Sequence, residues 1–304
     1  MEKKKFKRFG WKSILVLVLA VIFMLAGAAA VYYPMFAKNY AEEKKAEVMT
    51  EYYETVCDVG EEELETILES AYEYNEKLYS GEFDLTTPEE NGYYDELNLV
   101  GNGIMGYIEI PVIGVYLPIY HGVGSEELGI GCGHMPQTSL PVGGESTHAV
   151  ISAHTGSATA ELFTNLEEVE MGDRFYIHML DITLAYEVDQ IQVVMPYDVS
   201  AVKIDWGEDK ITLVTCTPYG VNTHRLLVTG HRIELEEEVS EGIPGVQYDG
   251  EVRSSWNEHY MQGILIGVAI GLPLVIIFII IALLLKRRNK KKKGSAANEP
   301  QEES

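Results

Sequence analysis

Two long apolar runs stand near the ends of the chain, and shorter apolar runs fill its middle. Residues 13–33 and 263–285 are each almost wholly apolar, and a helix of about 20 such residues crosses the hydrocarbon core of a bilayer. The pattern therefore predicts two transmembrane helices, the first of them a signal anchor. The small residues at 27–30 also fit a signal-peptidase site, and that alternative stays open.

Residues 38–80 show the spacing of helices, with a break near Asp58 and Gly60. The second helical piece places apolar side chains on one stripe, which predicts a packing face; the stripe comprises Leu64, Ile67, Leu68, Ala71 and Tyr72. Residues 81–102 are polar and show no clear period, which predicts a loop.

From residue 103 to residue 235 the chain alternates short β-branched runs with Gly, Pro, Asn and Asp. The predicted strands are 106–110, 115–120, 148–153, 174–180, 183–194, 210–216 and 225–235. Many short strands separated by turn signals predict an all-β sandwich or barrel. Residues 236–262 are acidic and lack apolar periodicity, so we expect a linker that returns to the membrane.

The charge distribution is strongly asymmetric. The chain has 23 basic and 47 acidic residues, and 13 of the basic ones lie in the terminal segments 1–12 and 286–304. Basic segments flanking membrane helices are typical of the cytoplasmic side and of contact with anionic lipid. We therefore expect a multi-pass protein of the cell membrane with both termini cytoplasmic and residues between the helices outside. The acidic middle argues against a nucleic-acid partner.

One of the three cysteines lies where chemistry is commonly carried. Cys216 ends the apolar run 210–216, and Arg225 begins the next run, so a turn would bring both side chains to one rim of the sheet. A nucleophilic thiol needs a partner for its proton. Among eight histidines, His154 stands out because it closes a predicted strand, although periodicity alone leaves the choice open.

The stretch "TLVTCTPYGVNTHRLLVTGHR" resembles the active-site signature of sortases, in particular the pilin-polymerising class C. The similarity extends through "MGYIEIPVIGVYLPIYHG", "GHMPQTSLPVGGESTHAVISAHTG" and "LFTNLEEVEMGDRFYI". It covers residues 103–232 nearly continuously. The resemblance implies a closed eight-stranded β-barrel with N-terminal helices, flanked by the two membrane helices.

The resemblance also implies a membrane-anchored cysteine transpeptidase of a Gram-positive cell, with catalytic residues Cys216, His154 and Arg225. Such enzymes cleave an LPxTG-like sorting signal between Thr and Gly, form a thioester on the cysteine and transfer it to an amine. A pilin lysine is the expected acceptor. The alternative is attachment of surface proteins to the peptidoglycan cross-bridge. In either case His154 would move protons between amines, and Arg225 would stabilise the oxyanion.

Two features depart from the class C pattern. Thr155 stands where many members have arginine after the catalytic histidine, and the Asp-Pro-aromatic lid motif is absent from the loop at 81–102. Asp84 is the candidate to face Arg225, and Phe83 the candidate to shield Cys216. Thr215, beside the cysteine, is a further candidate substrate contact.

Other chemistry receives little support from the sequence. "GNGIMG" at 101–106 precedes a strand, whereas a dinucleotide-binding loop connects a strand to a helix. Cys132 lies near His134 but without the spacing of a zinc site, so we expect no metal or cofactor, and both Cys132 and Cys57 are read as small buried thiols. A non-catalytic sortase-like binding module and a simple thiol protease remain as alternatives.

Overall fold

The computed structural model describes residues 11–125, 127–155 and 160–235, together with Arg253 and seven helical positions between 265 and 280. The chain divides into two compact units, residues 1–254 and 255–304. Most of the predicted linker 236–262 and of the predicted membrane helix 263–285 lies outside the described residues. The following paragraphs concern the first unit.

Eight strands close into a barrel in the order β1-β2-β3-β4-β7-β8-β6-β5. Their bounds are Ile104–Ile110 (β1), Val115–His121 (β2), Cys132–His134 (β3), Thr147–Ser152 (β4), Arg174–Met179 (β5), Ile182–Val194 (β6), Asp209–Thr217 (β7) and His224–Ile233 (β8). The pairs β2/β3 and β4/β7 are parallel and the other pairs are antiparallel. The closed mixed barrel confirms the predicted eight-stranded β-barrel, which is one part of the predicted fold class.

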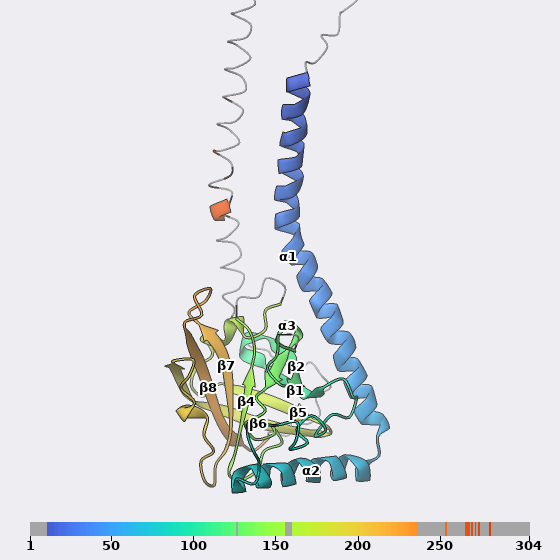
Figure 1. Ribbon diagram of the computed structural model, residues 1–304, viewed down its shortest axis with the longest axis vertical. Helices are drawn as coiled ribbons and strands as arrows, with labels where there is room; N and C mark the ends of the chain where they lie inside the picture. The colour runs from blue at the N-terminus through green and yellow to red at the C-terminus, as the bar shows by residue number, and fades with distance from the viewer. Residues whose placement is uncertain are drawn as a thin grey trace, which may run out of the picture. The chain divides into compact units, whose positions relative to one another are not determined.

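Helical elements precede and separate these strands, and the three α-helices are labelled in Figure 1. They are α1 (Trp11–Asp58), α2 (Glu61–Ser80), α3 (Glu127–Ile130) and the short 3₁₀ helices η1 (Pro111–Ile113), η2 (Thr164–Glu168) and η3 (Ser200–Val202). The predicted break between the first two helices is confirmed. Residues 13–33 are helical as part of α1, but in the described part of the chain we find no helix with the length and hydropathy that a membrane crossing requires.

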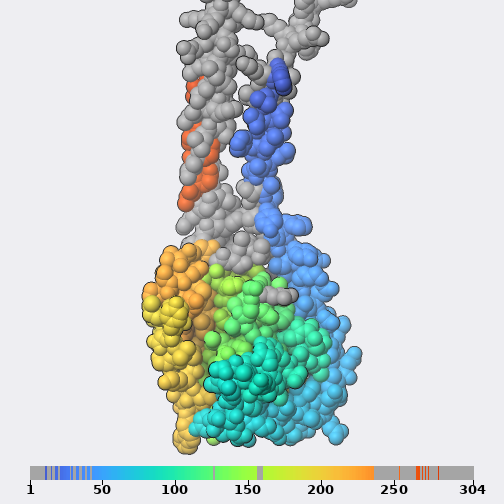
Figure 2. Space-filling model, viewed as in Figure 1, coloured from blue at the N-terminus to red at the C-terminus, as the bar shows by residue number. Residues whose placement is uncertain are grey.

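Figure 1 shows α2 at one end of the barrel and the β7–β8 turn at the other. The apolar face of α2 packs on the barrel, with Leu64 and Ala71 buried as predicted, but Tyr72 is exposed and Tyr74 is buried in its place. Asn75 joins the helix to the β3–β4 connection, because its amide exchanges two hydrogen bonds with the backbone of Leu140. Figure 2 shows α2 and the segment that follows it packed closely against the barrel.

The segment 81–102 is folded tightly against the barrel. Tyr93 is fully buried, and its hydroxyl contacts His134 Nδ1 at 2.9 Å and accepts a hydrogen bond from the Gly122 N–H at 3.1 Å. The other ring nitrogen of His134 donates to the Ser139 carbonyl at 2.7 Å. Burial therefore keeps His134 neutral, lowering its pKa from 6.5 to about 3.

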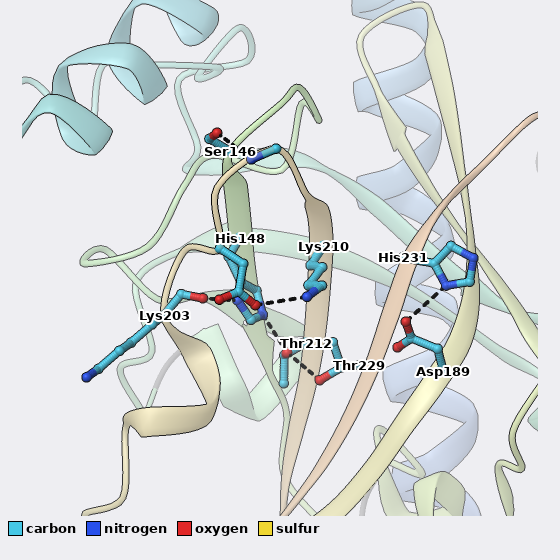
Figure 3. A network of polar contacts seen from close by, with 10 residues as sticks. Ser146, His148, Asp189, Lys203, Lys210, Thr212, Thr229 and His231 are labelled. Atoms are coloured by element: carbon cyan, nitrogen blue, oxygen red, sulfur yellow. Dashed lines mark hydrogen bonds and ion pairs between the residues drawn. The ribbon is translucent and has the colours of Figure 1, made fainter.

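A long connection returns along the outside of the barrel. Strand β6 ends beside the start of β8, where Val194 pairs with Arg225, and β7 begins beside Thr147 at the start of β4. Residues 195–208 must therefore travel the length of the strands. The end of this connection is fastened at two places, where Thr147 N–H donates to the Glu208 carbonyl and Gly207 N–H donates to Ser146 Oγ (Figure 3).

A chain of hydrogen bonds holds the middle of the same connection (Figure 3). His148 Nδ1 lies 2.8 Å from the Lys203 carbonyl oxygen, which only accepts, so this nitrogen carries the proton. His148 Nε2 then accepts from the Thr212 hydroxyl at 2.7 Å, and Thr212 accepts from Thr229 at 2.7 Å. Burial lowers the pKa of His148, which keeps the ring in this neutral form.

We predict that Thr212→Val destabilises the protein more than Thr229→Val. Losing Thr212 leaves His148 Nε2 and the Thr229 hydroxyl without partners, at a cost of about 1–3 kcal/mol. Losing Thr229 removes only the terminal donor, at a cost of about 0.5–1.5 kcal/mol. Urea unfolding followed by circular dichroism measures both. His231→Ala, which removes a half-exposed pair with Asp189, is the control and should change little; equal costs for the two threonine variants would contradict the proposed direction of the chain.

We predict that His134 makes the protein less stable in acid. Its pKa is near 6.5 in the unfolded chain and about 3 in the folded one, so the unfolded state binds the extra proton between these values. The free energy of unfolding therefore falls as pH drops through this window, by up to ~1.4 kcal/mol per pH unit.

Urea unfolding of the wild type and of His134→Asn at several pH values isolates this effect, because the carboxylates contribute equally to both proteins. We expect the difference in stability between the two proteins to shrink as pH falls. A constant difference would show that His134 binds a proton as readily in the folded state as in the unfolded chain.

Candidate active site

Cys216 lies one residue before the end of β7, which has β4 on one side and β8 on the other. Its register partner on β8 is Arg225. The structure therefore places the two residues side by side at one rim of the sheet, as the sequence predicted. Cross-strand partners in an antiparallel pair share a face. Cys216 is half-buried on the face of β7 that also carries Thr212 and Val214.

His154 follows the end of β4, on the side of Cys216 opposite to Arg225. Ser152 pairs with Val214 in the parallel ladder, and the Ala153 N–H continues the pairing by donating to the Val214 carbonyl at 3.1 Å. His154 lies two residues after Ser152, and Cys216 lies two residues after Val214. His154 is exposed, so an incoming group has access to it. The three neighbouring strand ends thus carry His154, Cys216 and Arg225 in that order.

The turn after Cys216 holds Arg225 in place. The N–H groups of Val221 and Asn222 both donate to the Pro218 carbonyl at 3.0 Å, and Asn222 has a φ of 61°, a conformation that asparagine tolerates well. The Arg225 guanidinium donates to the carbonyls of His224 at 3.0 Å and Asn222 at 3.4 Å. Arginine stays charged, and this half-exposed guanidinium retains further N–H groups for a substrate oxygen.

Thr215 lies on the other face of β7 from Cys216. It is fully buried, and its hydroxyl donates to the Ala153 carbonyl at 2.8 Å. This bond ties β7 to the residue that precedes His154. The described contacts therefore give Thr215 a place in the scaffold, whereas the sequence suggested a substrate contact.

Glu167 and Phe163 also contact this site, and the sequence gave no signal for them. The Thr217 hydroxyl donates to Glu167 Oε1 at 2.6 Å, and the Phe163 N–H donates to the His154 carbonyl at 3.1 Å. Glu167 belongs to η2, and Phe163 is the N-cap of this helix. The contacts join segments about 10 and 50 residues apart, which no local pattern reveals.

The structure does not bring Phe83 and Asp84 to the site as expected. The Asp84 carboxylate is exposed and accepts hydrogen bonds from the N–H and hydroxyl of Thr86, at 2.9 and 2.7 Å. These bonds lower its pKa. The Phe83 ring packs against Tyr74 on α2, with centroids 4.7 Å apart. Within the ranges that the structure describes, no ion pair joins Asp84 to Arg225.

The other two cysteines differ from each other. Cys132 is fully buried, as expected, and burial raises the pKa of its thiol. Cys57 is exposed on α1, so the expectation that it is buried was wrong. All three thiols are free, and Cys216 is the one that lies between a histidine and an arginine.

Comparisons with known proteins agree with this arrangement. The sortase domain family matches residues 108–233. Sortase C1 from Streptococcus agalactiae is 40% identical, with a TM-score of 0.61 over 62% of this chain and 100% of that structure. A Streptococcus pneumoniae sortase C, described for its catalysis and pilin substrate specificity, is 44% identical, with a TM-score of 0.57 over 62% of this chain and 97% of that one.

A curated relative gives the same result over a shorter segment. Sortase A of Streptococcus agalactiae serotype III is 33% identical over 138 residues, which are 44% of this chain and 53% of that protein. The chain thus spans about half the length of this relative. The family match at residues 108–233 contains all three strand ends described above, and the chain belongs to the sortase family of cysteine transpeptidases.

Proposed function

We propose that this protein joins an LPxTG-like sorting signal to an amine through a thioester on Cys216, and that the amine is a pilin lysine. The observation that carries the proposal is the placement of Cys216 between His154 and Arg225 on three neighbouring strand ends. The class C sortases among the similar structures favour the pilin acceptor.

The arrangement supports the first half of the reaction as follows. The Cys216 thiolate attacks the carbonyl carbon of the signal's threonine, and negative charge develops on the carbonyl oxygen. The Arg225 guanidinium, held at the same level of the neighbouring strand, stabilises that oxygen. The bond to the glycine nitrogen then breaks, His154 gives its proton to the departing amine, and a thioester remains.

The second half uses the same residues in reverse. The incoming lysine amine loses its proton to His154 and attacks the thioester carbonyl. The tetrahedral intermediate collapses, an amide bond forms, and Cys216 leaves as the thiolate. An exposed histidine suits this role, because two different amines must reach it in turn.

Attachment of surface proteins to a peptidoglycan cross-bridge is the second candidate. It is supported by the similarity to a curated sortase A and by the absence of an Asp84–Arg225 pair in the described residues. Both candidates share the thioester and differ only in the acceptor. Supplying the thioester with either a pilin domain or a cross-bridge peptide therefore separates them.

We expect full-length wild type to gain the mass of the acyl fragment when incubated with an LPxTG-like peptide, and Cys216→Ala to gain none. Intact mass spectrometry measures the adduct. If Cys216→Ala still joins peptide to amine, the assignment of Cys216 is wrong.

Arg225→Ala should slow thioester formation by roughly 10²–10³-fold, the range for loss of an oxyanion-stabilising group. Its free energy of unfolding should change by only about 0.5 kcal/mol, because within the described residues the guanidinium donates to carbonyls of its own turn alone. Arg232→Ala on the same strand, whose guanidinium lies over the Tyr186 ring, is the matched control and should keep the rate. A slower rate accompanied by an equally large loss of folding stability would contradict the proposed role of Arg225 in stabilising the oxyanion.

We also propose that the protein is anchored in the cell membrane with residues 38–262 outside. The apolar runs 13–33 and 263–285 and the basic segments beyond them support this topology. Exposed Cys57 provides the test in a Cys216→Ala background. A membrane-impermeant maleimide should label Cys57 on intact cells, and Cys57→Ser should abolish labelling; labelling only after lysis would reverse the topology.

A further inference from the structure

Arg253, in the stretch predicted as a linker, is bound to the barrel domain through both its backbone and its side chain. Its N–H donates to the Val112 carbonyl at 2.8 Å. Its guanidinium donates to both carboxylate oxygens of Asp173, at 2.7 and 3.2 Å, and to the Glu168 carbonyl at 3.0 Å. A bidentate arginine–carboxylate pair is strong and geometrically specific. The Asp173 side chain is only 16% exposed, which protects the pair from solvent screening.

The contacts of Arg253 fix one end of η2. Glu168 is the last residue of this 3₁₀ helix, and the last carbonyls of a helix lack partners within it. Arg253 supplies the missing donor and joins that end to Asp173, which in turn accepts a hydrogen bond from the Glu170 N–H at 2.7 Å. A 3₁₀ helix of five residues has little stability of its own, so an outside anchor determines where it lies.

The rest of η2 contacts two of the three catalytic strand ends. Its N-cap, Phe163, is fully buried and donates its N–H to the His154 carbonyl. Glu167 accepts a hydrogen bond from the Thr217 hydroxyl. Leu162, just before, is buried with a φ of 45°, a strained conformation that surrounding structure must impose. The segment therefore connects His154 to Thr217, the residue that follows Cys216.

We propose that Arg253 and Glu167 are positioning residues for the transpeptidation reaction: through η2 they set the position of His154 relative to Cys216. The inference rests on the proposed function. His154 lies beyond the last paired residue of β4, so its position depends on the bonds to its backbone and to Ala153. A misplacement of ~1 Å at a catalytic group costs up to ~10²-fold in rate.

The first test compares thioester formation by full-length wild type, Arg253→Ala and Arg253→Lys with an LPxTG-like peptide. Arg253→Ala should lower kcat at least about tenfold, with KM unchanged within about twofold because no substrate contact is lost. Arg253→Lys keeps one donor but loses the bidentate pair, so its kcat should be intermediate. Arg232→Ala is the arginine control and should keep both constants.

The second test concerns Glu167. Glu167→Gln keeps an oxygen that accepts from Thr217 and should retain kcat within about threefold, whereas Glu167→Ala should lower kcat about as Arg253→Ala does. The pair of variants separates the hydrogen bond from the charge. Circular dichroism establishes that each variant is folded; if Arg253→Ala does not fold, Arg253→Lys and Glu167→Ala carry the test.

The third test does not need the substrate. Alkylation of Cys216 by iodoacetamide is followed across pH by peptide mass spectrometry, with exposed Cys57 as the internal reference. Arg253→Ala and Glu167→Ala should change the pH profile of Cys216 and leave that of Cys57 unchanged, because a displaced His154 alters the surroundings of one thiol only.

The outcomes separate the two proposals. A wild type that forms no thioester would overturn the proposed function, and the alkylation profiles would still judge the role of η2. Folded Arg253→Ala and Glu167→Ala variants with wild-type kcat and wild-type alkylation profiles would overturn the inference and leave the proposed function standing. A rise in KM alone would also overturn it, because it would place these residues in substrate binding.

Discussion

The parallel pairing of β4 with β7 is the constraint on which the active site depends. It aligns Ser152 with Val214, so two strands that are about 60 residues apart in sequence end side by side. The tight β7–β8 turn then adds Arg225 from the other side. A slip of one residue in either ladder would move alternate side chains to the other face, and the thiol would no longer lie between its two partners.

The same pairing imposes a long route on the intervening chain. Parallel neighbours require a crossover connection, which here contains β5, β6 and the return along residues 195–208. Within the return along residues 195–208 the only regular structure is the three-residue helix η3, so this segment needs anchoring. His148 provides it, and His134 does the same for residues 81–102. In each case one ring nitrogen donates to a carbonyl and the other faces a hydroxyl. Two buried neutral histidines thus fasten irregular segments to the barrel.

Local patterns in the sequence were enough for most of the fold. Seven strands were predicted within a few residues of their bounds, because alternating apolar residues and turn residues mark them. The eighth strand, β3, was missed because it has only three residues, Cys132–His134, among glycines. The resemblance implied a closed eight-stranded barrel, but the order of its strands and its two parallel pairs came only from the structure, since pairing between distant strands leaves no local trace.

The candidate site was predictable to a similar extent. Strand ends placed Cys216 beside Arg225, and the resemblance selected His154. The expected position of Asp84 at Arg225 was not found because a local Asx turn with Thr86 takes up its carboxylate. Glu167 and Arg253 could not be predicted, because both act through hydrogen bonds to residues 50 or more positions away.

The proposed nucleophile and proton carrier lie on separate strand ends, and their placement needs more support than the barrel alone provides. Regular pairing fixes Cys216 and Arg225, but His154 lies beyond the last ladder pair of β4. Thr215 holds the residue before it and Phe163 holds its own carbonyl. Phe163 is the N-cap of η2, and Arg253 in turn holds the other end of this 3₁₀ helix. Because η2 links the contacts of Arg253, Glu167 and Phe163, removing one of them affects the others. The residues that support the site thus extend in sequence beyond the last strand of the barrel.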